Sequence, residues 1–180
     1  MPRPASTLTA RLRQSAGPLL PSILAAAALF FASGVQAQTM QSDRWSPAQL
    51  KERAEHLKEL AATGNGSASE TLSTYPRHFT MLAYRSRGGA GELHQHFADI
   101  FFIVEGHATL LTGGQLTDPK ALRPGEMAGT AVQGGSAQEL HVGDIVHIPA
   151  GMPHQMLVAP GDSVTYFVVK VEETDAAATH

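Results

Sequence analysis

The chain has 180 residues, no cysteine and a formal net charge of −3 when the histidines are neutral. We therefore expect one domain of ordinary size that folds without disulfides and carries no cysteine-linked lipid anchor. A mildly acidic chain lacks a broad basic surface, so neither nucleic acid nor an anionic membrane is an expected partner. These bounds favour a small-molecule ligand or another protein.

Residues 1–37 have the features of a secretory signal peptide. They contain arginines without an acidic residue, then an apolar run over 19–31, and they end in small residues at Ala37. An uncleaved anchor is the alternative, although the run is short for a bilayer span. We predict cleavage after Ala37, which leaves 143 of the 180 residues. The mature protein would start at Gln38, would be periplasmic or secreted, and would have no membrane attachment.

One amphipathic helix is predicted after Ser46, within a helix and lead-in segment at 38–70. Ser46 is a good N-cap, Pro47 suits the first helical position, and Gln49 completes a capping box. The residues that recur on its apolar face are Leu50, Ala54, Leu57 and Ala61. We expect this helix to pack on the rest of the domain.

Residues 71–173 change to short extended runs separated by glycine, proline and aspartate turns. The runs are 78–85, 91–96, 99–104, 107–112, 138–142, 144–149, 154–159 and 163–173. This pattern favours an all-β barrel or sandwich. The exception is a long insertion at 113–135, rich in glycine and proline, for which a lid over the site and a disordered surface loop are both open. We expect the tail at 174–180 to be flexible.

Two histidines stand one residue apart in the run 91–96. Alternate residues of a strand share a face, so His94 and His96 are expected to point the same way and to grip one ion. Such a pair alone is weak evidence for a metal. In a second segment, which begins about fifty residues later at Gly143, His154 follows a Pro-x-Gly turn that would swing it back toward the same site.

These two segments resemble the two motifs of the cupin superfamily, which are small β-barrels that hold a metal near one mouth. The first motif reads Gly, five residues, His-x-His, a short gap, Glu, six residues, Gly, and it is matched by Gly88, His94, His96, Asp99 and Gly106. The second reads Gly, five residues, Pro-x-Gly, two residues, His, three residues, Asn, and it is matched by Gly143, Pro149, Gly151 and His154. The resemblance implies an all-β, single-domain cupin barrel of the jelly-roll type, cupin-2-like and secreted, with the helix outside it.

The resemblance also implies one divalent metal ion, held by His94, His96, Asp99 and His154, with Zn, Cu, Mn, Fe and Ni all open. The sequence departs from the family pattern because Asp99 replaces the usual Glu and follows His96 after a gap one residue shorter than the common form. Strict alternation from His96 would turn Asp99 to the opposite face, so a turn or bulge must lie between them. Val158 also replaces the family's Asn.

Further side chains are expected around this metal. If Asp99 and His154 point inward, alternation carries an apolar wall to the same interior, namely Phe101, Ile103, Met156 and Val158. These four could line a ligand pocket or simply fill a small barrel. His147 is a candidate to hydrogen-bond a metal-ligating residue or the substrate. Glu126 and Met127 of the insertion are candidate residues of a lid.

Two classes of function follow from the resemblance. The first is an extracytoplasmic, metal-dependent enzyme, dioxygenase- or isomerase-like, that acts on a small, partly apolar molecule bearing oxygen. The alternative is a non-catalytic binding or sensing protein that uses its metal for structure or affinity. Ile100, Phe102 and Val104 make the outer face apolar as well. That face would be covered by the helix or by a second copy in a homodimer.

Overall fold

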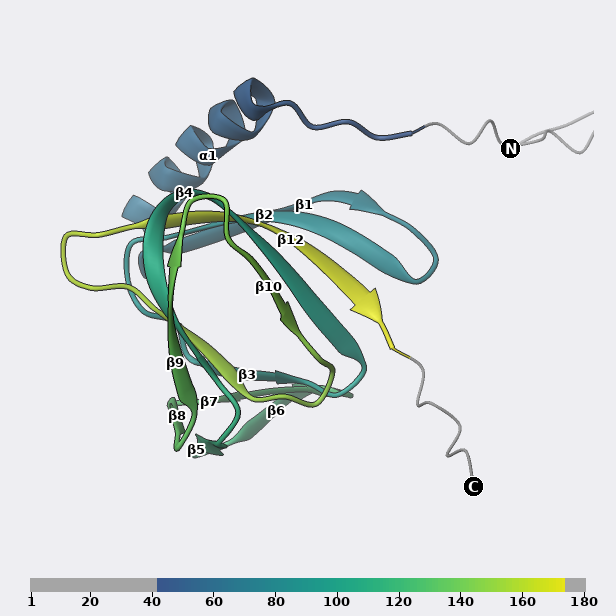
Figure 1. Cartoon of the computed structure of the whole chain (residues 1–180), viewed down its shortest axis with the longest axis vertical. Coiled ribbons are helices and arrows are strands. Elements are labelled where there is room, and N and C mark those ends of the chain that lie inside the picture. Colours follow the sequence, from purple (N-terminus) through teal and green to yellow (C-terminus); the bar gives the residue numbers. More distant parts are fainter. Residues whose placement is uncertain (1–41, 174–180) are drawn as a thin grey trace, which may run out of the picture. The chain divides into compact units, whose positions relative to one another are not determined.

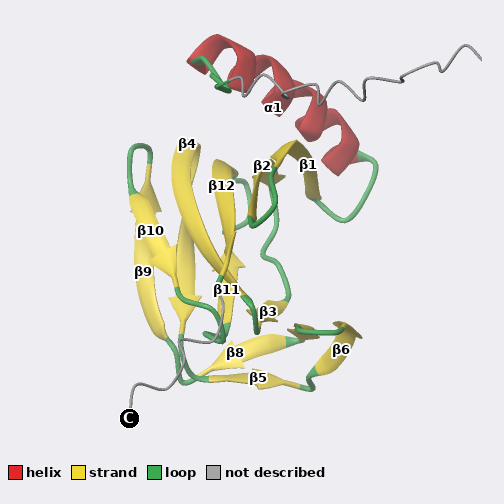
Figure 2. Ribbon diagram, turned by 90° about the vertical axis from the view of Figure 1, so that its right-hand side faces the viewer, coloured by secondary structure: helices red, strands yellow, loops and turns green. Residues whose placement is uncertain are grey.

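The computed structural model describes residues 42–173 (Figure 1). The predicted signal peptide at 1–37 and the predicted flexible tail at 174–180 lie outside the described residues. The described part has one helix followed by twelve strands (Figure 2), which confirms the predicted all-β class. No helix within residues 42–173 is long and apolar enough to cross a membrane.

The helix is α1 (Pro47–Ala62). The strands are β1 (Ser67–Thr74), β2 (His78–Arg85), β3 (Gly91–His94), β4 (Phe97–Thr112), β5 (Gln115–Thr117), β6 (Lys120–Arg123), β7 (Glu126–Gly129), β8 (Ala131–Gln133), β9 (Ser136–His141), β10 (Ile145–Ile148), β11 (His154–Leu157) and β12 (Val164–Glu172).

The helix forms as predicted. The Ser46 side chain accepts a hydrogen bond from the backbone N–H of Gln49, and the Gln49 side chain accepts one from the Ser46 N–H. Leu57 of α1 is buried and packs against Leu82 of β2. The next residue, Ala83, faces the opposite way and joins the main core. Strand β2 therefore separates the helix layer from the interior of the sheet.

Strand β4 is the organising strand because it pairs with four others. Its first half pairs with β12 and β10, and its second half pairs with β11 and β9. The runs 99–104 and 107–112, predicted as two strands, are this single strand of 16 residues. Gly106 lies between them at φ +75°, and a Cβ there would come within 1.9 Å of the Ser163 carbonyl oxygen. Only glycine fits this close approach.

The main sheet is antiparallel and runs in the order β1-β2-β12-β4-β11-β3-β7-β6, with β9 and β10 also paired to β4. Strands β3 and β11, which carry the two motif segments, are therefore neighbours (Figure 2). A second, two-stranded sheet is made by β5 and β8. This order brings sequence positions about sixty residues apart to one place.

The insertion at 113–135 is built of strands, so the expectation of a structureless loop is wrong. It contains β5, β6, β7 and β8, and β7 pairs along its whole length with β3. Strand β1 was not predicted either. It begins at Ser67, inside the predicted lead-in, and its sequence SASETLST has little apolar content. Its two apolar residues, Ala68 and Leu72, pack against the buried cluster formed with α1.

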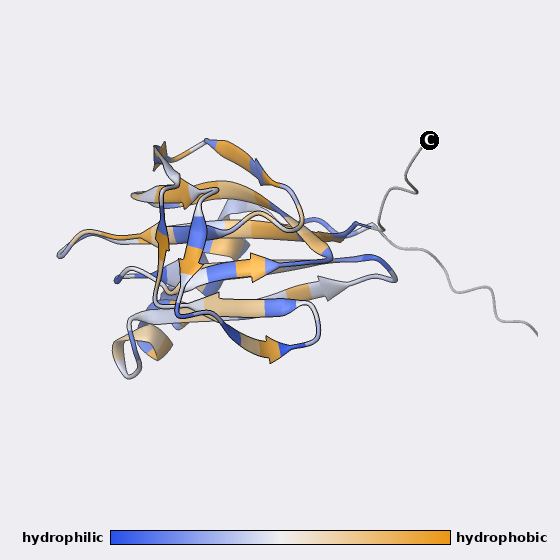
Figure 3. Ribbon diagram, turned by 90° about the horizontal axis from the view of Figure 1, so that it is seen from below, coloured by the Kyte–Doolittle hydropathy of each residue, from blue (hydrophilic) through white to orange (hydrophobic). Residues whose placement is uncertain are grey.

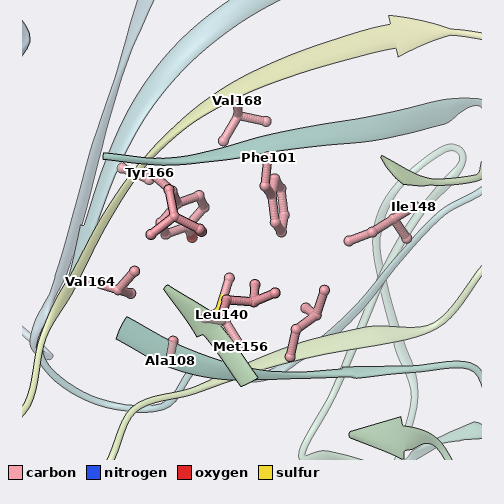
Figure 4. Packing of buried hydrophobic residues seen from close by; sticks show 11 residues of the cluster. Phe101, Ala108, Leu140, Ile148, Met156, Val164, Tyr166 and Val168 are labelled. Atoms are coloured by element: carbon pink, nitrogen blue, oxygen red, sulfur yellow. The ribbon is translucent and has the colours of Figure 1, made fainter. Parts of the chain in front are cut away.

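The main core fills the space that the curled sheet encloses (Figure 4). Its buried residues are Ala83, Phe101, Ile103, Ala108, Leu110, Leu140, Ile148, Met156, Val164, Tyr166 and Val168. Hydrophobic and hydrophilic segments alternate along the strands (Figure 3), as expected when one face of a strand meets the core. Phe101 of this core lies with its ring centroid 6.3 Å from that of His154.

Candidate metal centre

Three neighbouring strands, β11, β3 and β7, carry the polar side chains of the centre. Glu92 and His94 are two residues apart on β3, so they share a face. His154 of β11 lies directly opposite Glu92, and Glu126 of β7 lies directly opposite His94. Directly opposed residues in an antiparallel pair have Cβ atoms about 5 Å apart. The register therefore gathers two imidazoles and two carboxylates.

The Pro-x-Gly turn fixes the approach of the second motif. The backbone N–H of Gly151 donates to the His94 carbonyl at 2.7 Å, with φ +77° at Gly151. His154 comes three residues later, and its ring centroid lies 5.2 Å from that of His94. The turn thus returns the chain to β3, as the sequence predicted.

Asp99 enters from β4 after the chain bends at residues 95–96. Its Oδ2 atom is 3.5 Å from Nε2 of His94 and 3.5 Å from Nε2 of His154. Its Oδ1 atom accepts a hydrogen bond from Nζ of Lys170 at 2.6 Å, because Lys170 of β12 lies directly opposite Asp99. Asp99 is only 2% exposed, so this ion pair provides the compensation that a buried carboxylate needs.

The hydrogen bonds of the two imidazoles select the tautomer that a metal requires. Nδ1 of His94 lies 2.5 Å from Oε2 of Glu126, and Nδ1 of His154 lies 3.1 Å from the Met152 carbonyl oxygen. A carbonyl or carboxylate oxygen can only accept, so each Nδ1 carries the proton and each Nε2 presents a lone pair. A carboxylate or carbonyl behind a ligating histidine is the arrangement found around protein-bound metals.

The two Nε2 atoms are buried, and neither has a hydrogen-bond partner among the described residues. Leaving a buried polar atom without a partner costs roughly 1–3 kcal/mol. Donor atoms of Glu92, His94 and His154 all lie within 4.8 Å of one another, and Asp99 contacts both imidazoles. Nitrogen and carboxylate oxygen donors suit Zn²⁺ and other first-row divalent ions. The residues present therefore fit a divalent metal ion.

The charges around the cluster perturb the pKa values of its members. Burial alone would raise the pKa of Glu92, but the adjacent His94 and the Arg85 guanidinium outweigh it and lower that pKa from 4.5 to about 2. Burial lowers the pKa of His154 below 6.5. Burial also acts to lower the pKa of His94, but the carboxylates around its ring, Glu92 first, raise it above 6.5. Glu92 is thus ionised and His154 neutral near pH 7, as metal ligands must be.

A cavity of about 160 Å³ adjoins the cluster. Glu92 and Asp99 reach its wall, together with Arg85 and Lys170. Nε of Arg85 donates to the Tyr166 hydroxyl at 2.9 Å, and another of its nitrogens donates to Oε1 of Glu92 at 3.2 Å. Each acidic residue on the cavity wall therefore has its own basic partner.

The structure does not bring His96 to the cluster. Strand β3 ends at His94, so the alternation that would have paired His94 with His96 does not apply. His96 lies in the bend, is exposed, and packs its ring against Gly125, where an added Cβ would meet the ring at 2.7 Å. The residue that shares a face with His94 is Glu92, two positions earlier.

His147 is also placed away from the cluster. Its side chain is exposed on β10, and its Nε2 atom lies 4.0 Å from a carboxylate oxygen of Glu173. The orienting partner of a candidate ligand is instead Glu126, which the sequence had suggested as part of a lid. Met127, the other lid candidate, pairs with Leu93 in the β3–β7 ladder.

The four predicted wall residues belong mainly to the packed core. Phe101 and Met156 (Figure 4) are buried in the main cluster. Ile103 is buried there as well, and Val158 packs against it. Of these four, Phe101 alone also lines the cavity beside the cluster. The cavity wall is therefore a mixture of charged, hydroxyl and apolar groups and differs from the apolar wall that alternation suggested.

Sequence reasoning missed Glu92 and the role of Glu126. A signal for Glu92 was present in the shortened gap between His96 and Asp99. Four residues separate His94 from Asp99. If the gap of the motif is counted from His94 and not from His96, the predicted ligand pair lies two positions earlier, at Glu92-x-His94. Glu126 carries no such signal, because only the β3–β7 register places it beside His94.

Comparison with solved structures identifies the architecture. An uncharacterized protein with a double-stranded β-helix domain from Klebsiella pneumoniae superposes with a TM-score of 0.50 at 14% identity, over 74% of this chain and 93% of that chain. A cupin 2 conserved barrel domain protein from Rhodopseudomonas palustris gives 0.42 at 20% identity, over 61% and 63%. The DMSP lyase DddQ from Ruegeria pomeroyi gives 0.45 at 18% identity, over 65% and 52%, so this chain spans about half the length of that lyase.

No protein-family model matches the sequence, and no curated protein matches it either. The likeness at a TM-score of 0.50 shows the fold: the described part of the chain has the double-stranded β-helix fold. This confirms the fold that the resemblance to the cupin motifs implied. Within that fold, the chain carries a candidate His/Glu metal site at Glu92, His94 and His154.

Proposed function

We propose that this protein is a metal-dependent cupin enzyme that acts on a small oxygen-bearing molecule, with one divalent ion held by Glu92, His94, Asp99 and His154. The observation that carries the proposal is the pair of buried, unpartnered Nε2 atoms between two carboxylates. A cluster kept only for stability would be expected to satisfy those nitrogens within the protein.

The neighbouring residues prepare the site for chemistry. Glu126 and the Met152 carbonyl hold the Nδ1 protons and so fix both ring orientations. Lys170 and Arg85 hold one oxygen each of Asp99 and Glu92, which leaves the other oxygen of each carboxylate facing an imidazole. When bound, a divalent ion supplies Lewis-acid polarisation of a ligand oxygen.

A non-catalytic binding or sensing function is the second candidate, and one observation favours it. The carboxylates that line the cavity are both engaged by basic side chains, Glu92 by Arg85 and Asp99 by Lys170. No acidic residue on the described cavity wall is left uncommitted to serve as a general base. In this case the metal would act through affinity or structure alone.

We also propose that the protein works outside the cytoplasm, on the strength of the signal-peptide pattern in residues 1–37. A small molecule is its proposed partner. A homodimer through the outer sheet face stays a prediction. On that face, Phe102 and Val104 line a hollow of about 310 Å³ with Trp45, Leu50 and Phe167.

The test of the enzyme proposal uses protein stripped with a chelator and reloaded separately with Zn²⁺, Mn²⁺, Fe²⁺, Cu²⁺ or Ni²⁺. Each form is incubated in air with a panel of small hydroxy and 2-oxo acids, and the panel is followed by NMR. We expect conversion with at least one metal, its loss in His154→Ala, and its retention in His141→Ala, which removes an exposed histidine. Binding without conversion by any form would favour the second candidate.

A further inference from the structure

The cavity beside the metal centre has a composition that selects for ligand charge. Its charged wall residues are Arg85, Glu92, Asp99 and Lys170. Tyr166, Phe101 and Val168 supply aromatic and aliphatic surface. The volume of about 160 Å³ lies below the roughly 300–1,000 Å³ typical of sites for drug-sized ligands. The cavity therefore suits a small ligand.

The charge of the centre changes sign when a divalent ion binds. The carboxylates of Glu92, Asp99 and Glu126 contribute three negative charges, and Arg85 and Lys170 contribute two positive ones. With neutral histidines, these groups sum to one negative charge, which favours capture of a cation. A divalent ion converts that sum to one positive charge. Uncompensated charge in a partly buried site is costly, so the loaded centre favours a ligand with one negative charge.

The two basic side chains have donors to offer such a ligand. A lysine ammonium carries three N–H donors and an arginine guanidinium five. Lys170 makes one hydrogen bond at the site, to Asp99, and Arg85 makes two, to Tyr166 and Glu92. Both residues line the cavity. Once Asp99 and Glu92 share their charge with a metal ion, the attraction of these cations for a further anion increases.

We propose that the metal-loaded centre selects small monocarboxylates, with the ligand carboxylate held at Lys170 and Arg85 and its short carbon body against Phe101 and Val168. This inference rests on the proposed function, because without the metal the site charge is negative. It restricts the proposed class of oxygen-bearing ligands to anions. It also assigns to Lys170 a part in ligand specificity in addition to its pairing with Asp99.

The test compares butanoate with its neutral isostere butanamide, titrated calorimetrically into zinc-loaded protein purified after expression of the full chain. We expect butanoate to bind at least tenfold more tightly. In Lys170→Met the affinity for butanoate should fall at least tenfold while that for butanamide changes little. Lys58→Met is the matched control, because Lys58 lies on α1 and pairs with Glu55 and Glu105.

Zinc content measured on the same samples separates the possible failures. Protein that binds neither zinc nor any of Mn²⁺, Fe²⁺, Cu²⁺ and Ni²⁺ overturns the proposed function, and this inference with it. Zinc-loaded wild-type protein that binds butanamide as well as butanoate, or that binds neither, overturns the charge selection alone. The wild-type comparison stands even if Lys170→Met folds poorly, because it changes the ligand and leaves the protein intact.

Discussion

At the scale of single residues, His94 is the most closely surrounded group of the centre. Glu126 contacts its Nδ1 atom, and Glu92 and Asp99 lie 3.6 and 3.5 Å from its Nε2 atom. The ring is 9% exposed, so it cannot turn away from these partners without losing them. Its orientation, and hence its value as a ligand, depends on a residue 32 positions later in the chain.

Replacing Glu126 should therefore weaken metal binding although Glu126 is not itself a proposed ligand. We predict that Glu126→Ala lowers zinc affinity about 10- to 100-fold, the usual effect of removing a partner behind a ligating histidine. Glu126→Gln should restore part of it, because the amide oxygen can still accept from Nδ1. Competition with a chromophoric chelator measures the affinities, and Glu139→Ala on the exposed side of β9 is the control. Wild-type affinity in Glu126→Ala would remove this role.

Metal affinity should depend on pH through His94 first. Its pKa is raised above 6.5, so on acidification the metal-free protein takes up a proton there before it does so at His154, whose pKa is lowered. Binding must displace that proton. We predict that zinc affinity is constant above the His94 pKa and falls about tenfold per pH unit just below it. Zinc affinity measured by chelator competition at intervals of about one pH unit, from about pH 5 to about pH 9, tests this prediction. A zinc affinity that increases on acidification would contradict it.

At the scale of elements, the insertion between the two motifs is part of the centre. Strand β7 pairs with β3 from Gly91 to His94 and delivers Glu126 by register. Strand β6 continues the sheet beyond β7. Glycine and proline in this segment mark the turns between short strands. A lid role for these residues stays a prediction, and any opening of β7 would have to break the β3–β7 ladder.

Hydrogen exchange distinguishes a fixed strand from a lid. We predict that backbone amides in residues 126–129 are already protected from exchange in the metal-free protein. Amide hydrogens that are bonded in the ladder exchange with solvent only when the strand opens. Protection in this segment should change little when metal and ligand are added. Rapid exchange that slows strongly on ligand addition would instead support the lid. Strand β6, which is exposed and pairs only with β7 among the described strands, serves as the internal comparison.

At the scale of the whole molecule, local patterns predicted the elements, and long-range pairing decided the centre. The capping box at Ser46 predicted the start of α1, and the run 78–85 coincides with β2, because both signals are local. The motif spacing gave His94, Asp99 and His154. It misplaced His96, because β3 ends two residues earlier than the predicted run 91–96. The role of Glu126 could not be predicted, because it depends on the register between β3 and β7, and neither strand's sequence alone specifies that register.

The export prediction also belongs to the whole molecule. If residues 1–37 are a signal peptide, protein recovered from the periplasm or medium should begin at Gln38. Intact mass spectrometry of the exported protein tests this, with the cytoplasmic precursor as reference. A mature mass that retains the apolar run 19–31, or recovery only with carbonate-washed membranes, contradicts cleavage and favours the anchor.

Zinc stoichiometry across four matched variants tests the metal centre most directly. Wild-type protein, stripped and then dialysed against limiting zinc, should retain about one zinc ion per chain, as expected for a single site. Glu92→Gln and His154→Ala should lose most of it, whereas His96→Ala and His147→Ala, which alter exposed histidines, should retain it. Circular dichroism confirms that each variant is folded. Loss of zinc in His96→Ala together with full zinc in Glu92→Gln would contradict the centre described here.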